Sequence, residues 1–198
     1  TSATSFTTNE NGTAVSTMTA SDVDAGTTFA WSITGGADAS KFTINASTGA
    51  LTFVSSPDYE TPTDSGADNV YDLTITVSDG SLTASQNVAV TVANINDAPV
   101  ITSAATFNAA ENGTAVATMT STDQDAGATA TWSIVGGADA SKFTIDANTG
   151  VLTFVSAPDY EAPTDSGANN VYDVTVQVSD GTLTTQKAVA VTVTSVNE

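Results

Sequence analysis

The residues of this chain that could do chemistry are carboxylates, and they recur in short, ordered groups. In the first half of the sequence these are Glu10, Asp22, Asp24, Asp58, Glu60, Asp79 and Asp97. Carboxylates crowded together without basic partners favour a hard cation with several oxygen ligands, which is Ca²⁺ chemistry. Asp58 and Glu60 lie two positions apart on an extended segment, so their side chains should point to the same side. Each group alone is weak evidence, because Asp-Gly is usually a turn and Asp-x-Asp is often a solvated loop.

Composition excludes several classes of function. The 198 residues include 22 Asp plus Glu against 3 Lys plus Arg, giving a net charge of −19, with no His and no Cys. A nucleic-acid binder needs basic residues to neutralise phosphates, so no nucleic-acid partner is expected. Without His or Cys, histidine acid–base catalysis, thiol chemistry and disulfides are also excluded. No apolar run approaches the roughly 18 residues of a membrane span, so no membrane insertion is expected.

An internal repeat organises the chain. Trp31-Ser32-Ile33 returns as Trp132-Ser133-Ile134, and Gly35 to Ile44 returns unchanged as Gly136 to Ile145. The offset is 101 throughout, which is the size of an independent domain and far too long for a solenoid repeat. The sequence therefore predicts two copies of one module, residues 1–97 with a C-terminal linker and residues 98–198. Val196-Asn197-Glu198 restarts the linker pattern, so we expect the chain to be an excerpt of a longer array.

Each module is predicted to consist of strands. Alternating apolar and polar residues mark strands at 14–20, 29–33, 70–78 and around Val88 to Val92. Residues 41–45 and 51–55 flank Ser47-Thr48-Gly49, which favours a hairpin, and Asp79-Gly80 is a turn signal. Gly35-Gly36 is interpreted as a bulge or turn. Six or seven short strands in about 100 residues indicate an all-β fold, a Greek-key, immunoglobulin-like sandwich without the disulfide.

Taken together and in order, the acidic motifs resemble those of the extracellular cadherin repeat. They are Glu10-Asn11, Asp22-Val23-Asp24, Asp58-Tyr59-Glu60, Asp79 and Asn96-Asp97-Ala98-Pro99, and the second copy has Glu111-Asn112, Asp123-Gln124-Asp125, Asp159-Tyr160-Glu161 and Asp180. The resemblance covers the whole chain twice. The Thr/Ser/Ala-rich, Arg-free composition is similar to the cadherin-like repeats of large bacterial surface adhesins. The family would thus place the chain outside the cell or on its surface.

In that family Ca²⁺ binds between successive modules, so the resemblance implies a specific ligand set at the central junction. It consists of Glu10, Asp58, Glu60, the Ile95 carbonyl, Asn96, Asp97, the Ala98 carbonyl, Asp123, Asp125 and Asp180. The family linker has a further Asn where Ala98 stands, and the loop at 126–131 lacks an Asn, so two or three ions are expected. Asp22, Asp24 and Asp79 would serve a preceding module, and Glu111, Asp159 and Glu161 a following one.

The remaining acidic residues receive plainer interpretations. Asp64, Asp72, Asp165 and Asp173 match no family ligand and are interpreted as solvated surface charge, while Asp38 and Asp139 are interpreted as turn residues. Glu198 stands where a linker Asp would be expected. The site expected at the junction with a following module is therefore altered.

Three functions compete. The first is a Ca²⁺-rigidified extender segment of an adhesin, whose partners are neighbouring modules of the same chain. The second is a ligand-binding module for a cell-surface polysaccharide or a homotypic partner, and sugar binding usually involves exposed aromatic residues. The candidates are Trp31, Tyr59, Tyr71, Trp132, Tyr160 and Tyr172, for which core packing is the favoured interpretation. The third, a hydrolase using Asp58 and Glu60, is disfavoured because the chain lacks His, Arg and a Gly-rich binding loop, so no enzymatic activity is expected.

Overall fold

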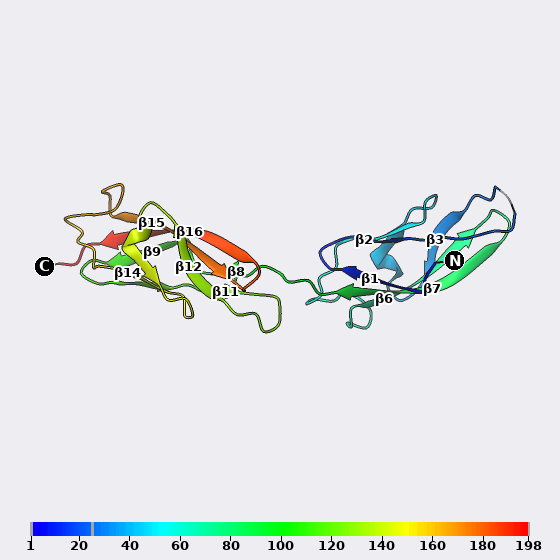
Figure 1. Cartoon of the computed structure of the whole chain (residues 1–198), viewed down its shortest axis with the longest axis horizontal. Coiled ribbons are helices and arrows are strands. Elements are labelled where there is room, and N and C mark those ends of the chain that lie inside the picture. The colour runs from blue at the N-terminus through cyan, green and yellow to red at the C-terminus, as the bar shows by residue number, and fades with distance from the viewer. Residues whose placement is uncertain (1, 25, 198) are drawn as a thin grey trace. The chain divides into compact units, whose positions relative to one another are not determined.

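A computed structural model describes residues 2–24 and 26–197 (Figure 1). The chain divides into two compact units, Thr1–Ile95 and Asn96–Glu198, which we describe separately as unit 1 and unit 2. The module boundary expected after Asp97 stays a prediction, and Glu198 lies outside the described residues. No helix in the described part of the chain is long and apolar enough to cross a membrane.

Unit 1 consists of two β-sheets. The larger sheet has the order β1-β7-β6-β3 and contains β1 (Ser5–Asn9), β7 (Thr83–Ala93), β6 (Val70–Ser78) and β3 (Ala30–Gly35). β1 runs parallel to β7, and the other pairs are antiparallel. The smaller sheet has the order β2-β5-β4, with β2 (Ala14–Thr17), β5 (Ala50–Phe53) and β4 (Phe42–Ile44), and a 3₁₀ turn η1 (Ala39–Lys41) precedes β4.

Unit 2 repeats this arrangement and adds one short ladder. Its larger sheet is β12 (Thr131–Gly136), β15 (Val171–Ser179), β16 (Thr184–Thr194) and β9 (Thr106–Ala110), and its smaller sheet is β10 (Ala115–Thr118), β14 (Val151–Phe154) and β13 (Phe143–Ile145), which follows η2 (Ala140–Lys142). In addition, β8 (Val100–Ile101) pairs with β11 (Ser121–Thr122). The all-β, Greek-key sandwich predicted from the sequence is confirmed for both units.

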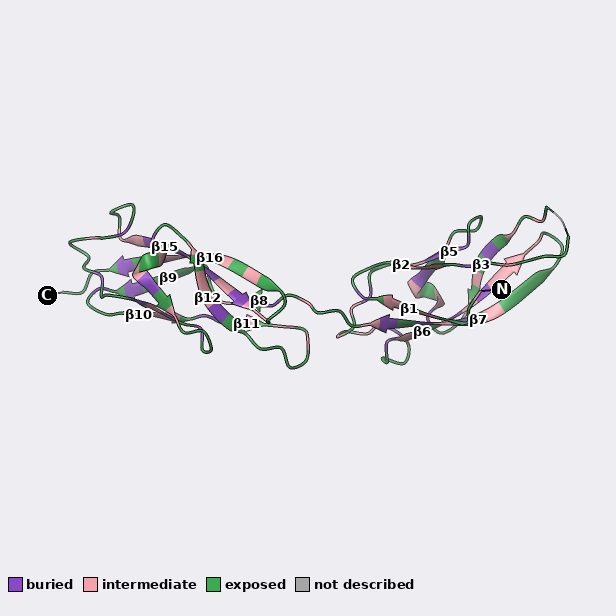
Figure 2. Cartoon of the chain, viewed as in Figure 1, coloured by how far each residue is buried: buried purple, intermediate pink, exposed green. Residues whose placement is uncertain are grey.

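The core of each unit lies between its two sheets. Along β6, Tyr71, Leu73 and Ile75 are buried while the residues between them are not, as the period of a strand requires. Figure 2 shows buried stretches alternating with more exposed ones along the strands. From the opposite sheet Phe42 and Phe53 meet Tyr71, with ring centroids 5.9 and 5.1 Å away. Fully burying a side chain of this kind contributes about 1.5–3 kcal/mol.

Several local predictions are confirmed. Phe42 pairs with Phe53 in the expected hairpin, and β6 spans Val70–Ser78 as predicted. The register of β3 against β6 shifts between Ile33 and Gly35, so the Gly-Gly pair does mark a bulge. Gly36 has a φ of +102°, and a Cβ at Gly36 would lie 2.2 Å from the Cα of Leu73. Only glycine fits there, because both the backbone angle and the close approach exclude a side chain.

The interpretation of Asp64 and Asp165 as solvated surface charge is wrong. Asp64 is buried, and its carboxylate accepts backbone N–H bonds from Gly66, Asp68 and Asn69 at 3.0–3.1 Å. Asp165 does the same in unit 2. Both loops close around the carboxylate because it satisfies amides that would otherwise be unpaired.

Asp38 and Asp139 also do more than form turns. Asp38 is buried and accepts the backbone N–H groups of Ser65 and Asp72 at 2.7 and 2.9 Å. It thereby joins η1 to the loop that precedes β6 and to β6 itself. Asp139 makes the matching bonds in unit 2. Asp72 and Asp173 are exposed, in agreement with their interpretation as solvated charge.

Candidate metal centres

One end of unit 1 carries a cluster of three carboxylates. Glu10 directly follows β1, and Asp58 and Glu60 lie in the loop after β5. One oxygen from each of the three lies within 4.8 Å of the others. Glu10 is only 2% exposed, whereas Asp58 and Glu60 are half-buried. Three acidic groups at this separation repel one another unless a cation lies among them, because each close pair costs about 1 kcal/mol even in water.

Backbone amides hold the buried member of this cluster in place. Oε2 of Glu10 accepts the N–H of Tyr59 at 2.7 Å, and Oε1 accepts the N–H of Ile95 at 2.9 Å. Glu10 therefore connects the end of β1, the Asp58–Glu60 loop and the last residue of unit 1. The side chain of Asn94 donates to Oε1 of Glu60 at 2.6 Å. Asn94 was not among the residues predicted from the sequence, where its position next to Ile95 is the only signal for it.

Unit 2 contains the same cluster, formed by Glu111, Asp159 and Glu161. Oε2 of Glu111 accepts the N–H of Tyr160 at 2.8 Å and Oε1 accepts that of Val196 at 2.7 Å. These two bonds stabilise the ionised form and outweigh burial, so the pKa of Glu111 lies below its ordinary value. The outer half-site predicted to serve a following module is thus assembled within its own unit.

A second acidic group of unit 2 lies next to the linker residues Asn96 and Asp97. The backbone N–H of Asp97 donates to Oδ2 of Asp125 at 2.6 Å, and Nδ2 of Asn96 donates to Oδ2 of Asp180 at 2.8 Å. The Asn96 amide, together with the backbone N–H groups of Leu183 and Thr182, lowers the pKa of Asp180. The structure therefore brings Asn96, Asp97, Asp125 and Asp180 together within unit 2.

The carboxylate of Asp123 gives the clearest indication of a cation site. Its Oδ1 accepts the N–H of Asp125 at 3.0 Å, but Oδ2 is buried and no donor in the described residues bonds to it. A buried carboxylate oxygen without a partner is costly. An oxygen ligand in that position fits a hard cation such as Ca²⁺. Ala98 is exposed, and its side chain has no oxygen, so only its backbone carbonyl could serve as a ligand.

In unit 1 the residues that correspond to Asp123, Asp125 and Asp180 are Asp22, Asp24 and Asp79. Oδ1 of Asp22 accepts the N–H of Asp24 at 2.9 Å, and Oδ1 of Asp79 accepts two backbone amides of the following turn, Ser81 and Leu82, both at 2.6 Å. The N–H groups of Leu82 and Ser81 lower the pKa of Asp79, and the neighbouring Asp22 side chain adds to this. The structure thus brings Asp22 and Asp79 close together.

The aromatic residues divide into two sets. Trp31, Tyr71, Trp132 and Tyr172 are buried in the cores, in agreement with the favoured interpretation. For Tyr59 and Tyr160 that interpretation is wrong, because their side chains are 38% and 40% exposed. Each of these tyrosines lies between the two acidic residues of an Asp-Tyr-Glu motif, where the backbone turns the carboxylates toward the cluster and the ring toward solvent.

Comparison with known proteins identifies the two units. The family model for the cadherin domain matches residues 4–95 and again residues 105–196. Human protocadherin Fat 1 is 31% identical over 209 residues, and the match covers 98% of this chain but 4% of that protein. Human protocadherin Fat 4 is 35% identical over 161 residues, covering 76% of this chain and 3% of the relative. The chain therefore spans only a few per cent of these relatives.

Solved structures share the fold. Domains EC1-2 of human protocadherin-24 superpose with a TM-score of 0.61 at 22% identity, covering 98% of this chain and 95% of that one. Domains EC22-24 of mouse cadherin-23 give a TM-score of 0.53 at 26% identity, covering 97% of this chain and 62% of that one. Both solved structures contain consecutive EC domains.

Proposed function

The chain belongs to the cadherin domain family, and from this membership we propose that it is a Ca²⁺-rigidified extender segment of a surface or secreted adhesin. Cadherin domains are extracellular adhesion modules, not enzymes, and in cadherins they bind Ca²⁺. Cadherin repeats interact with neighbouring modules and homotypically. The finer proposal is that Ca²⁺ is held at the junction between unit 1 and unit 2.

The observation that carries this proposal is the arrangement of the carboxylates around the linker. Unit 1 binds the N–H of Ile95 with Glu10, and unit 2 binds the N–H of Asp97 with Asp125. Only Asn96 separates these two linker residues in the sequence. Each acidic group is thus attached to the same short stretch of chain, which supports a shared site.

The proposed ligands are those the sequence analysis assigned to the central junction. They are Glu10, Asp58, Glu60, Ile95, Asn96, Asp97, Ala98, Asp123, Asp125 and Asp180. The set is rich in carboxylate and carbonyl oxygens, which Ca²⁺ prefers, and the unpartnered Oδ2 of Asp123 fits the same ion. Its seven carboxylates carry −7, so three Ca²⁺ would supply +6 and nearly neutralise the site, whereas two would supply +4.

Bound Ca²⁺ would supply a multivalent cross-link between two domains. Relative motion is the default for two domains joined by a short linker. Ca²⁺ ions ligated by residues of both units would restrict this motion, so a flexible connection would become a rigid one. The Thr/Ser/Ala-rich composition and the near-identical copies support a role in reach and stiffness within a bacterial surface adhesin, for example in a biofilm.

Small-angle scattering of the whole chain tests the proposal. The wild type should be more extended and stiffer in Ca²⁺ than in chelator, and Asp97→Ala in Ca²⁺ should resemble the chelated wild type. Asp72→Ala, which removes an exposed carboxylate outside the clusters, is the matched control and should behave as wild type. A chelated wild type that is equally extended and rigid would refute the Ca²⁺-dependent rigid connection and favour a conformation fixed by Pro99.

One observation favours the second candidate function, a module that binds a polysaccharide or a homotypic partner. Tyr59 and Tyr160 expose aromatic rings at the same place in both units. Such rings supply contact area for sugars or proteins. Binding of surface polysaccharide, or self-association in analytical ultracentrifugation, that is lost in the Tyr59→Ala, Tyr160→Ala double variant would support this alternative.

A further inference from the structure

Both units contain the same small pocket, in which a lysine lies among hydroxyl groups. In unit 1 this pocket lies beside η1 and the loop that follows β5, has a volume of about 260 Å³, and is lined by residues that include Ser40, Lys41, Ser55, Ser56, Thr63 and Tyr71. The equivalent pocket of unit 2 has a volume of about 420 Å³. It is lined by the matching residues Ser141, Lys142, Ser156, Thr164 and Tyr172. Pockets for small ligands span about 300–1,000 Å³, so both pockets match one small molecule.

Two of the three basic residues of the chain lie in these pockets, Lys41 in unit 1 and Lys142 in unit 2. Both are half-buried. Among the described residues, neither ammonium group forms a salt bridge or a hydrogen bond, although the chain has 22 acidic residues. The third lysine, Lys187, differs, because its ammonium group donates to the backbone carbonyls of Ile101 and Ser103. A cation without a partner in a concave site favours an anionic ligand.

The hydroxyl groups around the lysine of unit 1 are also available to a ligand. Within the described residues, no hydrogen bond engages the side chains of Ser40, Ser55 or Ser56. The phenol oxygen of Tyr71 accepts the N–H of Thr63 at 3.3 Å, and its contact with Oγ1 of Thr63 is long, at 3.4 Å. The matching contacts in unit 2 are 3.2 and 3.4 Å. Each pocket thus combines one positive charge with several hydroxyl groups that both donate and accept.

An exposed aliphatic side chain lies beside the lysine in each pocket. Val54 is 62% exposed and Val155 is 61% exposed, and both line their pockets. The N–H of Val54 donates to the carbonyl of Lys41 at 2.8 Å, and the N–H of Val155 donates to that of Lys142 at 2.8 Å. The backbone therefore holds an apolar side chain and a cation next to each other at the same place in both units.

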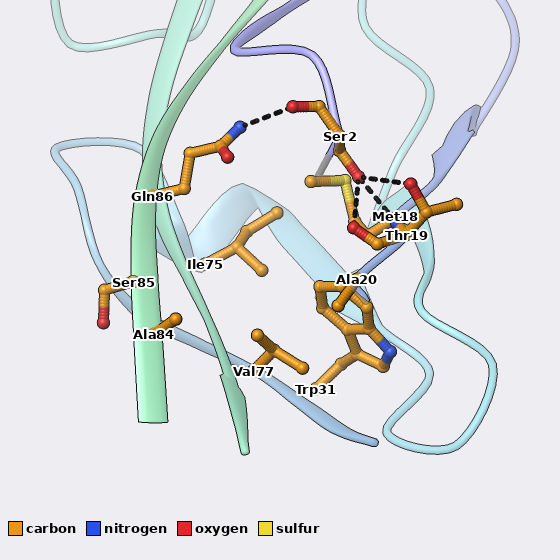
Figure 3. Close-up of a pocket in the computed structure, with 10 residues that line it drawn as sticks. All are labelled: Ser2, Met18, Thr19, Ala20, Trp31, Ile75, Val77, Ala84, Ser85 and Gln86. Carbon is orange, nitrogen blue, oxygen red and sulfur yellow. Dashed lines mark hydrogen bonds between the residues drawn. The ribbon is translucent and has the colours of Figure 1, made fainter. Parts of the chain in front are cut away.

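A different cavity of unit 1 lacks this combination. It has a volume of about 120 Å³ and lies among Met18, Trp31 and Ile75 (Figure 3). None of the described residues that line it is charged. The side chain of Gln86 borders it but is already engaged, because its Nε2 donates to the carbonyl of Ser2 at 3.3 Å, as Figure 3 shows. That cavity therefore has no group that would select an anionic ligand.

We propose that the lysine pocket of each unit binds a carboxylated sugar ring, as found in a uronic acid. The ammonium group of Lys41 or Lys142 binds the carboxylate through charge-assisted hydrogen bonds. The serine, threonine and tyrosine hydroxyls bind the hydroxyl groups of the sugar, and the apolar face of the ring packs on Val54 or Val155. This site goes beyond the proposed Ca²⁺-rigidified extender and does not depend on it.

The pocket of unit 1 is separate from the acidic cluster and from the exposed tyrosine. Asp38, Asp58 and Tyr59 are near the pocket residues in the sequence but do not line the pocket. Asp38 is buried, and its two oxygens accept backbone N–H groups. The net charge of −19 repels an anionic sugar, but charges farther away are screened over about 10 Å at 0.1 M salt.

Titration of the whole chain with sodium glucuronate, followed by ¹H–¹⁵N NMR, tests the proposal. The amide signals of Val54 and Val155 report on the two pockets separately, because each N–H is bonded to the carbonyl of a pocket lysine. Both signals should shift and saturate. Glucose, which lacks the carboxylate, and acetate, which lacks the ring, should each bind at least about tenfold more weakly. Ca²⁺ is left out, so that glucuronate cannot bind through an ion at the acidic clusters and the result is independent of the proposed Ca²⁺ junction.

Lys41→Gln should weaken glucuronate binding in unit 1 by about tenfold or more, because the charge-assisted bond is lost. The unchanged pocket of unit 2 is the matched internal control, and its Val155 signal should respond as in the wild type. Lys41→Arg keeps the positive charge and should retain binding. Lys142→Gln should give the reverse pattern, with binding lost in unit 2 and kept in unit 1.

Several results would overturn the proposal. One is the absence of any shift of Val54 and Val155 with glucuronate. Another is an equal response to glucose or to acetate, since the pocket would then be a site for neutral sugars or for any anion. Unchanged binding in Lys41→Gln, or equal weakening in both units, would show that the lysine does not bind the carboxylate in its own pocket.

Discussion

Glu10 shows how a single buried carboxylate can join three segments distant in sequence. Both of its oxygens accept backbone N–H groups, from Tyr59 and from Ile95. Hydrogen bonds to a charged group contribute about 1.5–3 kcal/mol each, and a buried donor left without its acceptor incurs its full desolvation cost. Glu10 therefore has a structural role even before any cation binds.

Glu10→Gln should lower the free energy of unfolding of unit 1 by about 1–3 kcal/mol in chelator, because the amide group presents a donor to one of these N–H groups. Urea unfolding followed by Trp31 fluorescence in a Trp132→Phe background measures this. The exposed control Asp72→Asn should stay within about 0.5 kcal/mol of wild type. A Glu10→Gln variant as stable as that control would show that the two bonds contribute nothing.

The charge of Asp64 makes stability depend on pH. Burial raises its pKa, but the backbone N–H groups of Asp68, Asn69 and Gly66 outweigh that effect and hold the pKa below the ordinary 3.8. A depressed folded pKa means that the stabilisation is fully present above the unfolded value and is lost as pH falls through the folded value. Glu111, Asp146, Asp165 and Asp180 shift in the same direction.

We therefore expect acid destabilisation that begins below about pH 5. Asp64→Asn should be less stable than wild type at neutral pH, yet lose less of its remaining stability on acidification, because the titrating group is gone. Urea midpoints at neutral pH and at about pH 3 measure both effects, and Asp165→Asn is the matched variant in unit 2. An unchanged pH slope in Asp64→Asn would contradict the assignment.

At the scale of the elements, glycine decides how β3 ends against β6. Gly36 combines a positive φ with backbone contact to Leu73, whereas Gly80 has a φ of +97° and nothing within 4 Å of its virtual Cβ. A substitution at Gly80 would therefore test backbone strain alone, whereas one at Gly36 would test strain together with a steric clash. Strain alone costs about 1–3 kcal/mol, and a clash with fixed backbone adds to it.

Gly80→Ala should thus destabilise unit 1 by about 1 kcal/mol, and Gly36→Ala by more than about 3 kcal/mol, because β3 and β6 must separate to admit the methyl group. Thermal unfolding of the two variants measures the difference. Gly137→Ala should reproduce the larger effect in unit 2, where the Cβ would lie 2.4 Å from the Cα of Val174. Equal effects of Gly36→Ala and Gly80→Ala would mean that the backbone contact is readily relaxed.

At the scale of the whole molecule, the net charge is −19, and some of the acidic residues that produce it lie together in clusters. Self-repulsion destabilises a compact state, and salt screens it over about 10 Å at 0.1 M. Screening differs from coordination, because sodium ions do not supply the fixed, multivalent contacts that Ca²⁺ makes with several oxygens.

Ca²⁺ at about 10 mM, roughly 100 times a dissociation constant of ~10⁻⁴ M, should stabilise the chain by about 2.7 kcal/mol for a single site. The Tm should rise correspondingly. Sodium chloride at the same ionic strength should recover only part of this rise, as measured by calorimetry with chelated protein as the reference. Sodium chloride matching the effect of Ca²⁺ would exclude coordinated sites.

The repeat, the strands and the ordered acidic motifs can all be predicted from the sequence. They are local patterns: alternation marks β6, Ser47-Thr48-Gly49 marks the β4–β5 hairpin, and short spacings mark Asp58 and Glu60. The cadherin resemblance rests on such spacings, and the family match confirms it. Such patterns are readable because side-chain direction within a strand depends only on the period of the backbone.

Only the tertiary structure could decide which distant groups meet. Glu10 and Ile95 are 85 positions apart, β1 runs parallel to β7, and a loop closes around Asp64 although its sequence suggested exposure. Val77 and Val178 are the sharpest case, because they occupy matching strands but differ in burial. Burial depends on what packs against a residue from elsewhere in the chain, and the spacing of its neighbours carries no information about that.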